Sequence, residues 1–150
     1  MRKASSRNLT RVYVDAKIVG RHLPHAEYKT FVAFIAEGRP DLNGFKEVEA
    51  EETDRAEEEA MLNAIQKLTR FPHNLKRFVI ICDHESAVLK ANWKGAQRKG
   101  NGDETLEKLW EELDLNPGVE VDPLTANPAH RFLNLKLKEM ADLEKQSNDR

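Results

Sequence analysis

Three acidic residues stand in apolar surroundings, where ionised side chains are rarely found. Asp15 interrupts an apolar segment, Asp83 directly follows the apolar run 78–82, and Glu57 lies in the apolar stripe of a predicted helix. A carboxylate in such surroundings costs several kcal/mol unless it is protonated or paired with a cation. The run 78–82 (FVIIC) offers no lysine or arginine. Because hard oxygen ligands select Mg²⁺ or Mn²⁺, the three acids together predict a divalent-metal site.

The orientation of Glu57 follows from the helical repeat. At about 100° per residue, the apolar residues of this helix fall on the same side as Glu57: Ala60, Met61, Ala64 and Leu68. Glu58 falls at the edge of that stripe and Glu59 on the opposite face, so both are expected at a solvated surface. The sequence therefore predicts that Glu57 points toward the sheet.

Each acid also has an ordinary structural explanation. Asp15 fits the exposed face of a strand, and Asp83 fits the N-cap of a following helix. Glu57 in an N-terminal turn favours the helix dipole. Taken singly, each acid is a weak indication of a metal site. The three together, in this order of strands and helices, favour the metal site.

Five strands and four helices are predicted, in the order β-β-β-α-β-α-α-β-α. Apolar patterns indicate strands at residues 9–19, 29–36, 45–50, 78–82 and 119–124. Helices are expected from Thr53, as N-cap, to about residue 69, over 85–92 and 104–113, and from Asn127-Pro128 to about residue 145. Residues 38–44 (GRPDLNG) are expected to form a turn. Short connections favour an antiparallel meander for the first three strands, within one α/β domain whose mixed sheet is flanked by helices.

The composition bounds the class of protein. The 150 residues are 39% hydrophobic and 33% charged, which favours a single folded domain over disorder or membrane residence. Cys82 is the one cysteine, and no run of about 18 apolar residues occurs. We therefore expect a cytoplasmic chain without disulfides or membrane spans. Residues 1–8 are expected to form a flexible basic tail, and residues 146–150 a frayed end.

The order and spacing of these motifs resemble the ribonuclease H fold, and specifically the ribonuclease HI family, over nearly the whole chain. The likeness is carried by residues 12–15 (VYVD), 56–64 (AEEEAMLNA), 81–88 (ICDHESAV) and 127–134 (NPAHRFLN). This resemblance implies a ribonuclease H-like α/β fold. Its five-stranded mixed sheet would have three antiparallel strands followed by two parallel ones.

The resemblance implies a metal-dependent endoribonuclease that hydrolyses the RNA strand of RNA–DNA hybrids and leaves 5′-phosphate and 3′-hydroxyl ends. Two Mg²⁺ or Mn²⁺ ions would be held by Asp15, Glu57, Asp83 and, at the family's fourth acidic position, Asn134. Asn134 is neutral, but its amide oxygen can still ligate a hard cation. His130 and Asp142 stay open as alternative fourth ligands.

The chain departs from the family's pattern near the expected site. Ala16-Lys17 replaces the usual Gly-Ser after the first acid, and His84 rather than serine follows Asp83. The loop 124–126 before the last helix lacks the usual histidine, and the next histidine is His130. His84 and His130 are therefore candidate accessory residues.

The resemblance also implies a basic segment that grips the nucleic acid: Lys90, Trp93, Lys94, Arg98 and Lys99. The basic side chains would contact phosphates, and the tryptophan ring would pack against a sugar or brace the loop. The alternative is a solvated helix end beside a core tryptophan.

Two other functions stay open, because a fold does not determine a substrate. The chain could be a nuclease of the same fold that acts on structured DNA, or a non-catalytic module that binds nucleic acid. The three retained acids argue against the module, since an unused cluster of buried acids destabilises a fold. In each case we expect a monomer.

Overall fold

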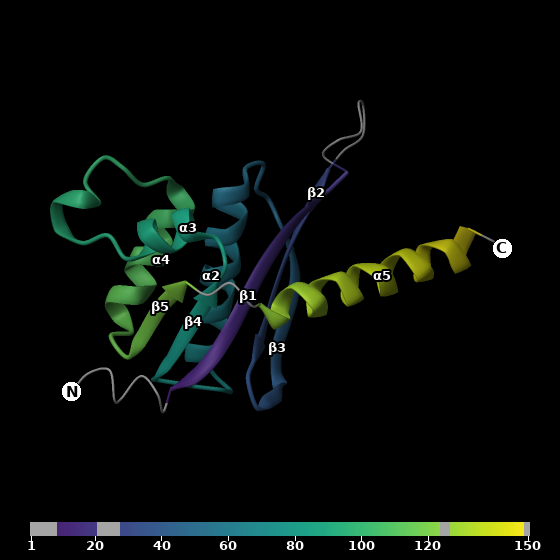
Figure 1. Ribbon diagram of the computed structural model, residues 1–150, viewed down its shortest axis with the longest axis horizontal. Helices are drawn as coiled ribbons and strands as arrows, with labels where there is room; N and C mark the ends of the chain where they lie inside the picture. The colour runs from purple at the N-terminus through teal and green to yellow at the C-terminus, as the bar shows by residue number, and fades with distance from the viewer. Residues whose placement is uncertain (1–8, 21–27, 124–126, 149–150) are drawn as a thin grey trace.

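The computed structural model describes residues 9–20, 28–123 and 127–148. Its centre is a five-stranded sheet in the order β3-β2-β1-β4-β5, flanked by helices (Figure 1). The strands are β1 (Thr10–Val19), β2 (Lys29–Ala36), β3 (Arg39–Val48), β4 (Phe78–Cys82) and β5 (Val119–Pro123). The helices are α2 (Thr53–Thr69), α3 (Glu85–Ala91), the short 3-10 helix η1 (Gly95–Gln97), α4 (Glu104–Leu115) and α5 (Pro128–Asn148). The antiparallel pairs β1–β2 and β2–β3 and the parallel pairs β1–β4 and β4–β5 confirm the predicted fold class.

The sheet separates two cores. Val12 and Val14 of β1 pack into the larger core with apolar residues of α2, α3 and α4. Tyr13 faces the other way and packs with Ala129 of α5. Because side chains alternate along a strand, Asp15 lies on the face that α5 covers. In Figure 1, α5 crosses this face and its C-terminal end projects away from the sheet.

The third strand is longer than predicted. β3 begins at Arg39, so the turn predicted over residues 38–44 is correct at Gly38 and wrong from Arg39 on. β3 is an edge strand, and an edge position accommodates Pro40, which has no N–H group for a second neighbour. Gly44 is needed for packing, because a Cβ at this position would overlap the ring of Phe34. Residues typical of turns are therefore used here at the margin of a sheet.

The helix ends follow the sequence signals in part. Asn127 caps α5 as predicted, since its Oδ1 accepts a hydrogen bond from the Ala129 N–H at 2.9 Å. α5 continues to Asn148, beyond its predicted end. Thr53 is not the cap of α2; Glu52 occupies that position and makes no side-chain capping hydrogen bond.

Three sequence expectations concern residues wholly or partly outside the described ranges. These are the basic tail at residues 1–8, the loop 124–126, where the family's histidine is lacking, and the frayed end at residues 146–150, of which 149–150 are not described. Residues 146–148 belong to α5. Among the described residues, no helix has both the length and the apolar character that crossing a membrane requires.

Candidate active site

The sheet opens where β1 passes the end of β4. β1 pairs with β4 as far as Tyr13, opposite Ile81, whereas its pairing with β2 continues to Val19. Asp15 and Asp83 each stand two residues beyond that last β1–β4 pair. Since parallel strands advance equally per residue, both carboxylates lie at the same level of the opening. The β-strand register therefore explains how two acids distant in sequence meet.

Glu57 reaches the same opening from the start of α2. Its side chain is buried, with the residue 4% exposed. The Cys82 thiol donates a hydrogen bond to Glu57 Oε2 at 3.3 Å. The potential ligand atoms of Glu57, Cys82 and Asp83 lie within 4.8 Å of one another. The structure thus brings Glu57 to the sheet, as the helical stripe predicts.

Burial and like charge raise the pKa of both buried acids. Burial is the main cause for Glu57, whose pKa rises to about 8, and the negative charges of Asp15 and Asp83 add to the rise. Burial also raises the pKa of Asp15, while a hydrogen bond with His130 opposes that rise. The negative charge of Asp83 raises the pKa of Asp15 further. The charges of Asp15 and Asp83 therefore disfavour the charged form of Glu57, the charge of Asp83 disfavours that of Asp15, and a cation would relieve this repulsion.

The donor set fits a hard divalent cation. Carboxylate oxygens arrive from β1, from α2 and from the end of β4, and Mg²⁺ and Mn²⁺ prefer such oxygens. Cys82 is a poorer ligand, because it is fully buried and burial raises the pKa of its thiol. The thiol therefore keeps its proton and serves as a donor to Glu57. This hydrogen bond between a thiol and an acid was not foreseen from the sequence.

The predicted fourth ligand is separated from the three acids by a histidine. His130 Nδ1 lies 2.9 Å from Asp15 Oδ2, and His130 Nε2 lies 3.2 Å from Asn134 Nδ2. The Asn134 Oδ1 accepts a hydrogen bond from Lys17 Nζ at 3.2 Å. Asp142 is exposed two turns further along α5, about 12 Å beyond Asn134. Of the three candidate fourth ligands, all within the described residues, His130 is the one that contacts a clustered acid.

His84 is turned toward other partners. Its Nδ1 accepts a hydrogen bond from the Ala87 N–H at 3.3 Å and caps α3, and its Nε2 lies 3.2 Å from an oxygen of Asp54. The alternative explanation of Asp83 as the cap of this helix is therefore wrong. Asp83 is exposed at the opening instead. His84 serves the start of α3, and its contacts give no support to an accessory role at the site.

Two of the predicted nucleic-acid-binding residues are held by acidic side chains. Lys90 Nζ lies 2.7 Å from Asp54 Oδ2, and this contact is the main cause that lowers the pKa of Asp54. Arg98 donates two hydrogen bonds to Asp114, at 2.7 and 3.1 Å, and a third to the Trp93 carbonyl at 2.7 Å. Lys90 and Arg98 therefore contribute to the fold, and their charge is partly neutralised.

The other three residues of the basic segment differ in exposure. Trp93 is half-buried and packs against the larger core, with its ring 6.4 Å from that of Trp110. Lys94 and Lys99 are exposed. The alternative of a core tryptophan thus describes Trp93, and the exposed positive charge of this predicted set lies at Lys94 and Lys99.

Glu58 overturns part of the helical-stripe interpretation. It is expected in solvent but is 1% exposed, because α4 packs across this side of α2. Burial raises the pKa of Glu58 to about 8, and the nearby Asp103 adds to the rise. Glu58 Oε1 has no hydrogen-bond partner among the described residues. Glu59, also expected in solvent, accepts a hydrogen bond from Thr105 of α4 at 2.8 Å.

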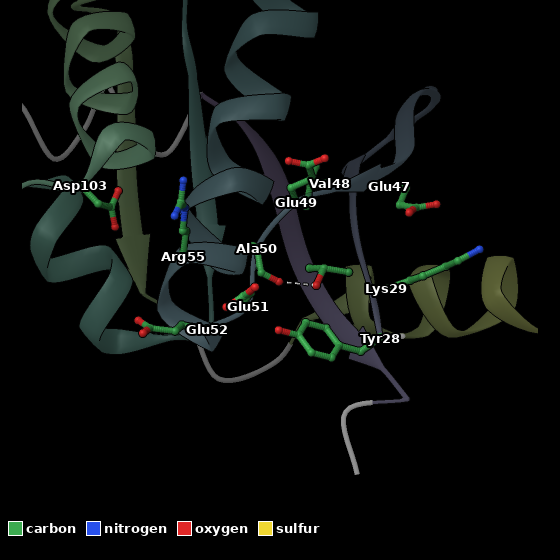
Figure 2. A pocket seen from close by; sticks show the side chains of 11 residues that line it. Tyr28, Lys29, Glu47, Val48, Glu49, Ala50, Glu51, Glu52, Arg55 and Asp103 are labelled. Carbon is green, nitrogen blue, oxygen red and sulfur yellow. Dashed lines mark hydrogen bonds between the residues drawn. The ribbon is translucent and has the colours of Figure 1, made fainter. Parts of the chain in front are cut away.

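A hollow of about 630 Å³ lies beside the first turn of α2, between the start of β2 and the end of β3 (Figure 2). A hydrogen bond from Thr30 Oγ1 to the Ala50 carbonyl, 2.6 Å long, joins two of its walls. Its acidic lining residues are Glu47, Glu49, Glu51, Glu52 and Asp103, and its basic ones are Lys29 and Arg55. This acidic wall disfavours a phosphate backbone.

The strand order and the helices on both faces of the sheet define an α/β protein with the ribonuclease H fold. No protein-family model matches the sequence, and no curated protein matches it. Solved structures do match. An RNase H1 named LC11, in complex with an RNA/DNA hybrid, is 15% identical with a TM-score of 0.61, over 83% of this chain and 94% of that chain.

Two further structures extend the comparison. The N-terminal RNase H domain of rv2228c from Mycobacterium tuberculosis is 12% identical with a TM-score of 0.55, over 90% of this chain and 97% of that chain. The protease–reverse transcriptase of prototype foamy virus is 14% identical with a TM-score of 0.58, over 77% of this chain. The match spans 17% of that viral chain. At such identities these structures show a shared fold.

Proposed function

We propose that this chain is a divalent-metal-dependent endoribonuclease that hydrolyses the RNA strand of RNA–DNA hybrids. The observation that carries the proposal is that Glu57 and Asp83 lie together at the opening between β1 and β4, close enough to Asp15 for the charges of these acids to raise the pKa of Asp15 and of Glu57. Asp15 and Glu57 are buried, burial raises the pKa of both, and the charges of neighbouring acids raise them further, an arrangement that costs stability unless a cation is bound. A ribonuclease HI-type activity requires a bound divalent ion, and that ion would offset the destabilisation.

Asp15, Glu57 and Asp83 would hold the metal. When bound, a divalent ion supplies a water of lowered pKa and neutralises charge that develops on the phosphate. The protein's own part is to fix three oxygens from separate elements and to keep Glu57 oriented through the Cys82 thiol. The proposed products carry 5′-phosphate and 3′-hydroxyl ends. The second ion of the expected pair depends on Asn134, whose oxygen already accepts a hydrogen bond from Lys17.

The substrate class is supported by the matched structures. LC11 RNase H1 and the foamy viral protease–reverse transcriptase each have a structure with an RNA/DNA hybrid. In this chain, Lys94 and Lys99 are the exposed basic residues of the predicted gripping segment. We propose that they contact phosphates, whereas Lys90 and Arg98 hold the segment in place.

A structured-DNA substrate is the second candidate, because the foamy viral enzyme also has a structure with double-stranded DNA.

The decisive experiment incubates the chain with end-labelled RNA–DNA hybrid, RNA duplex and DNA duplex, in Mg²⁺ and in Mn²⁺. We expect hybrid cleavage that requires the metal and is abolished in Asp83→Asn. Asp142→Asn is the matched control and should keep full activity, since Asp142 is exposed on α5.

The other outcomes assign other functions. Cleavage of DNA duplex with the hybrid intact would replace the proposal with the structured-DNA nuclease. Tight hybrid binding without cleavage in either metal would replace it with a non-catalytic binding module.

A further inference from the structure

A hydrogen-bonded chain of side chains runs from β1 across α5 and back to the acids. Lys17 Nζ lies 3.2 Å from Asn134 Oδ1, and Asn134 Nδ2 lies 3.2 Å from His130 Nε2. His130 Nδ1 lies 2.9 Å from Asp15 Oδ2. Lys17 and Asp15 are two residues apart on β1 and therefore share a face of the sheet. The series of hydrogen bonds thus begins and ends on the same strand.

The chemistry of the groups determines the direction of every bond. An ammonium group donates and never accepts, so Asn134 must turn its oxygen to Lys17 and its NH₂ group to His130. His130 Nε2 must then accept, which leaves the ring proton on Nδ1. Nδ1–H therefore donates to Asp15. A single exposed lysine determines the orientation of the amide, the tautomer of the imidazole and the partner of one Asp15 oxygen.

Each oxygen that a second ion would need already accepts one hydrogen bond within this series of side chains. Asp15 Oδ2 accepts from His130, and Asn134 Oδ1 accepts from Lys17. Magnesium–oxygen distances are about 2.1 Å, so an ion on Asn134 Oδ1 would lie at most about 5.3 Å from Lys17 Nζ. Two cations at that separation repel each other.

Two departures from the family's pattern meet in one contact. Lys17 stands where serine is usual, and Asn134 stands at the fourth acidic position. An aspartate at position 134 beside a serine at position 17 would offer an anionic oxygen without a neighbouring cation. The lysine–asparagine pair offers a neutral oxygen that is already hydrogen-bonded to a positive charge.

We infer that the Lys17 ammonium, fixed by Asn134, supplies the second positive charge of the site, so that the chain binds one divalent ion at Asp15, Glu57 and Asp83. This inference rests on the proposed metal-dependent function. Lys17 and Asn134 are thereby positioning residues: they hold a positive charge on Asn134 and a histidine on Asp15, and they are not metal ligands.

The test counts bound Mn²⁺ per chain by electron paramagnetic resonance, in which free Mn²⁺ gives the signal that binding removes. We expect one ion for the wild type and for Lys17→Arg, which keeps the cation. The double variant Lys17→Ser with Asn134→Asp should bind two. Lys17→Ser alone should bind one ion roughly threefold more tightly, because a nearby positive charge is lost. Lys138→Ser, an exposed lysine of α5, is the matched control and should behave as wild type.

Two ions on the wild type, or one ion on the double variant, would overturn the inference. Hybrid cleavage measured on the same samples separates it from the proposed function. Cleavage by a wild type that binds two ions would overturn the inference and leave the proposed function standing. A wild type that binds one ion, gains a second in the double variant and cleaves no hybrid would overturn the proposed function alone.

Discussion

Glu57 and Glu58 are neighbours in α2 that reach opposite kinds of surroundings. Both are buried, and burial is the main cause that raises the pKa of each to about 8. Glu57 faces the opening between β1 and β4, where Asp15 and Asp83 add their charges. Glu58 faces α4, where Asp103 is the acid that adds most to its shift.

The difference shows that burial and a raised pKa do not by themselves identify a metal site. Glu57 has neighbouring acids from β1 and from just after β4, and an oriented hydrogen bond from Cys82, so its surroundings suit a cation. Glu58 leaves one oxygen without a hydrogen-bond partner in the described part of the chain. Lys90, whose positive charge lowers the pKa of Glu58, pairs with Asp54. We therefore interpret Glu58 as a protonated residue of the α2–α4 contact.

The largest expected effect separates the two glutamates by activity. Glu57→Gln should lower the rate of hybrid cleavage by about 10³-fold or more, because it removes a ligand oxygen at the reacting centre. Glu58→Gln should change the rate by less than about twofold, within the scatter for residues away from the site. Single-turnover cleavage at saturating Mg²⁺ measures both. Equal losses in the two variants would contradict the distinction.

A second effect is the stabilisation of the fold by metal. At a concentration about 100 times its dissociation constant, Mn²⁺ should stabilise the wild type and Glu58→Gln by about 2.7 kcal/mol. Glu57→Gln should lose most of this gain. Urea unfolding with and without Mn²⁺, followed by circular dichroism, measures it. Full stabilisation of Glu57→Gln would remove Glu57 from the ligand set.

A third effect concerns pH and stability without metal. The folded-state pKa of Glu58 is raised from 4.5 to about 8, so between these values the folded chain holds a proton that the unfolded chain has lost. The contribution of Glu58 to the free energy of unfolding is therefore greatest below pH 4.5 and falls as the pH rises toward 8. Glu58→Gln should remove this part of the pH dependence, and it should be more stable than the wild type at pH 8 by up to about 4 kcal/mol.

Urea titrations across that range in chelator measure this difference. Glu111→Gln on the exposed side of α4 is the control and should follow the wild type. A Glu58→Gln curve parallel to that of the wild type would show that Glu58 is not protonated in the folded chain.

The smallest expected effect tests the thiol. Cys82→Ser keeps a donor toward Glu57, whereas Cys82→Ala removes it. The alanine variant should weaken Mn²⁺ binding by about tenfold, the lower end for lost supporting contacts in metal sites. The serine variant should weaken it less. Calorimetric titration with Mn²⁺ distinguishes them, and equal affinities would mean that the thiol only fills space.

Local patterns were sufficient for the elements that carry the acids. The apolar runs of β1 and β4 and the stripe of α2 predict where Asp15, Glu57 and Asp83 lie, because each depends on a repeat within one segment. The start of β3 was missed because Pro40 and Gly44 are typical of turns, and their use at a sheet edge depends on a neighbouring strand.

Contacts between distant segments could not be predicted in the same way. The burial of Glu58 depends on α4, and the pairing of Arg98 depends on Asp114, sixteen residues away. The bond between Lys17 and Asn134 spans 117 positions. No periodicity within a segment encodes such pairs. The sequence therefore predicted the acids of the site more fully than the groups that hold and balance them.

The hydrogen bonds that hold the Arg98 side chain affect how the loop around η1 would bind a ligand. Its guanidinium is fixed on Asp114 and the Trp93 carbonyl, and lies 5.3 Å from the centre of the Trp110 ring. These contacts reduce the conformational entropy of the loop in the folded chain. Binding of a ligand would therefore cost less conformational entropy at this loop. The loop would therefore be pre-organised for a nucleic-acid strand that fits it, and it would adapt little to a strand that does not fit.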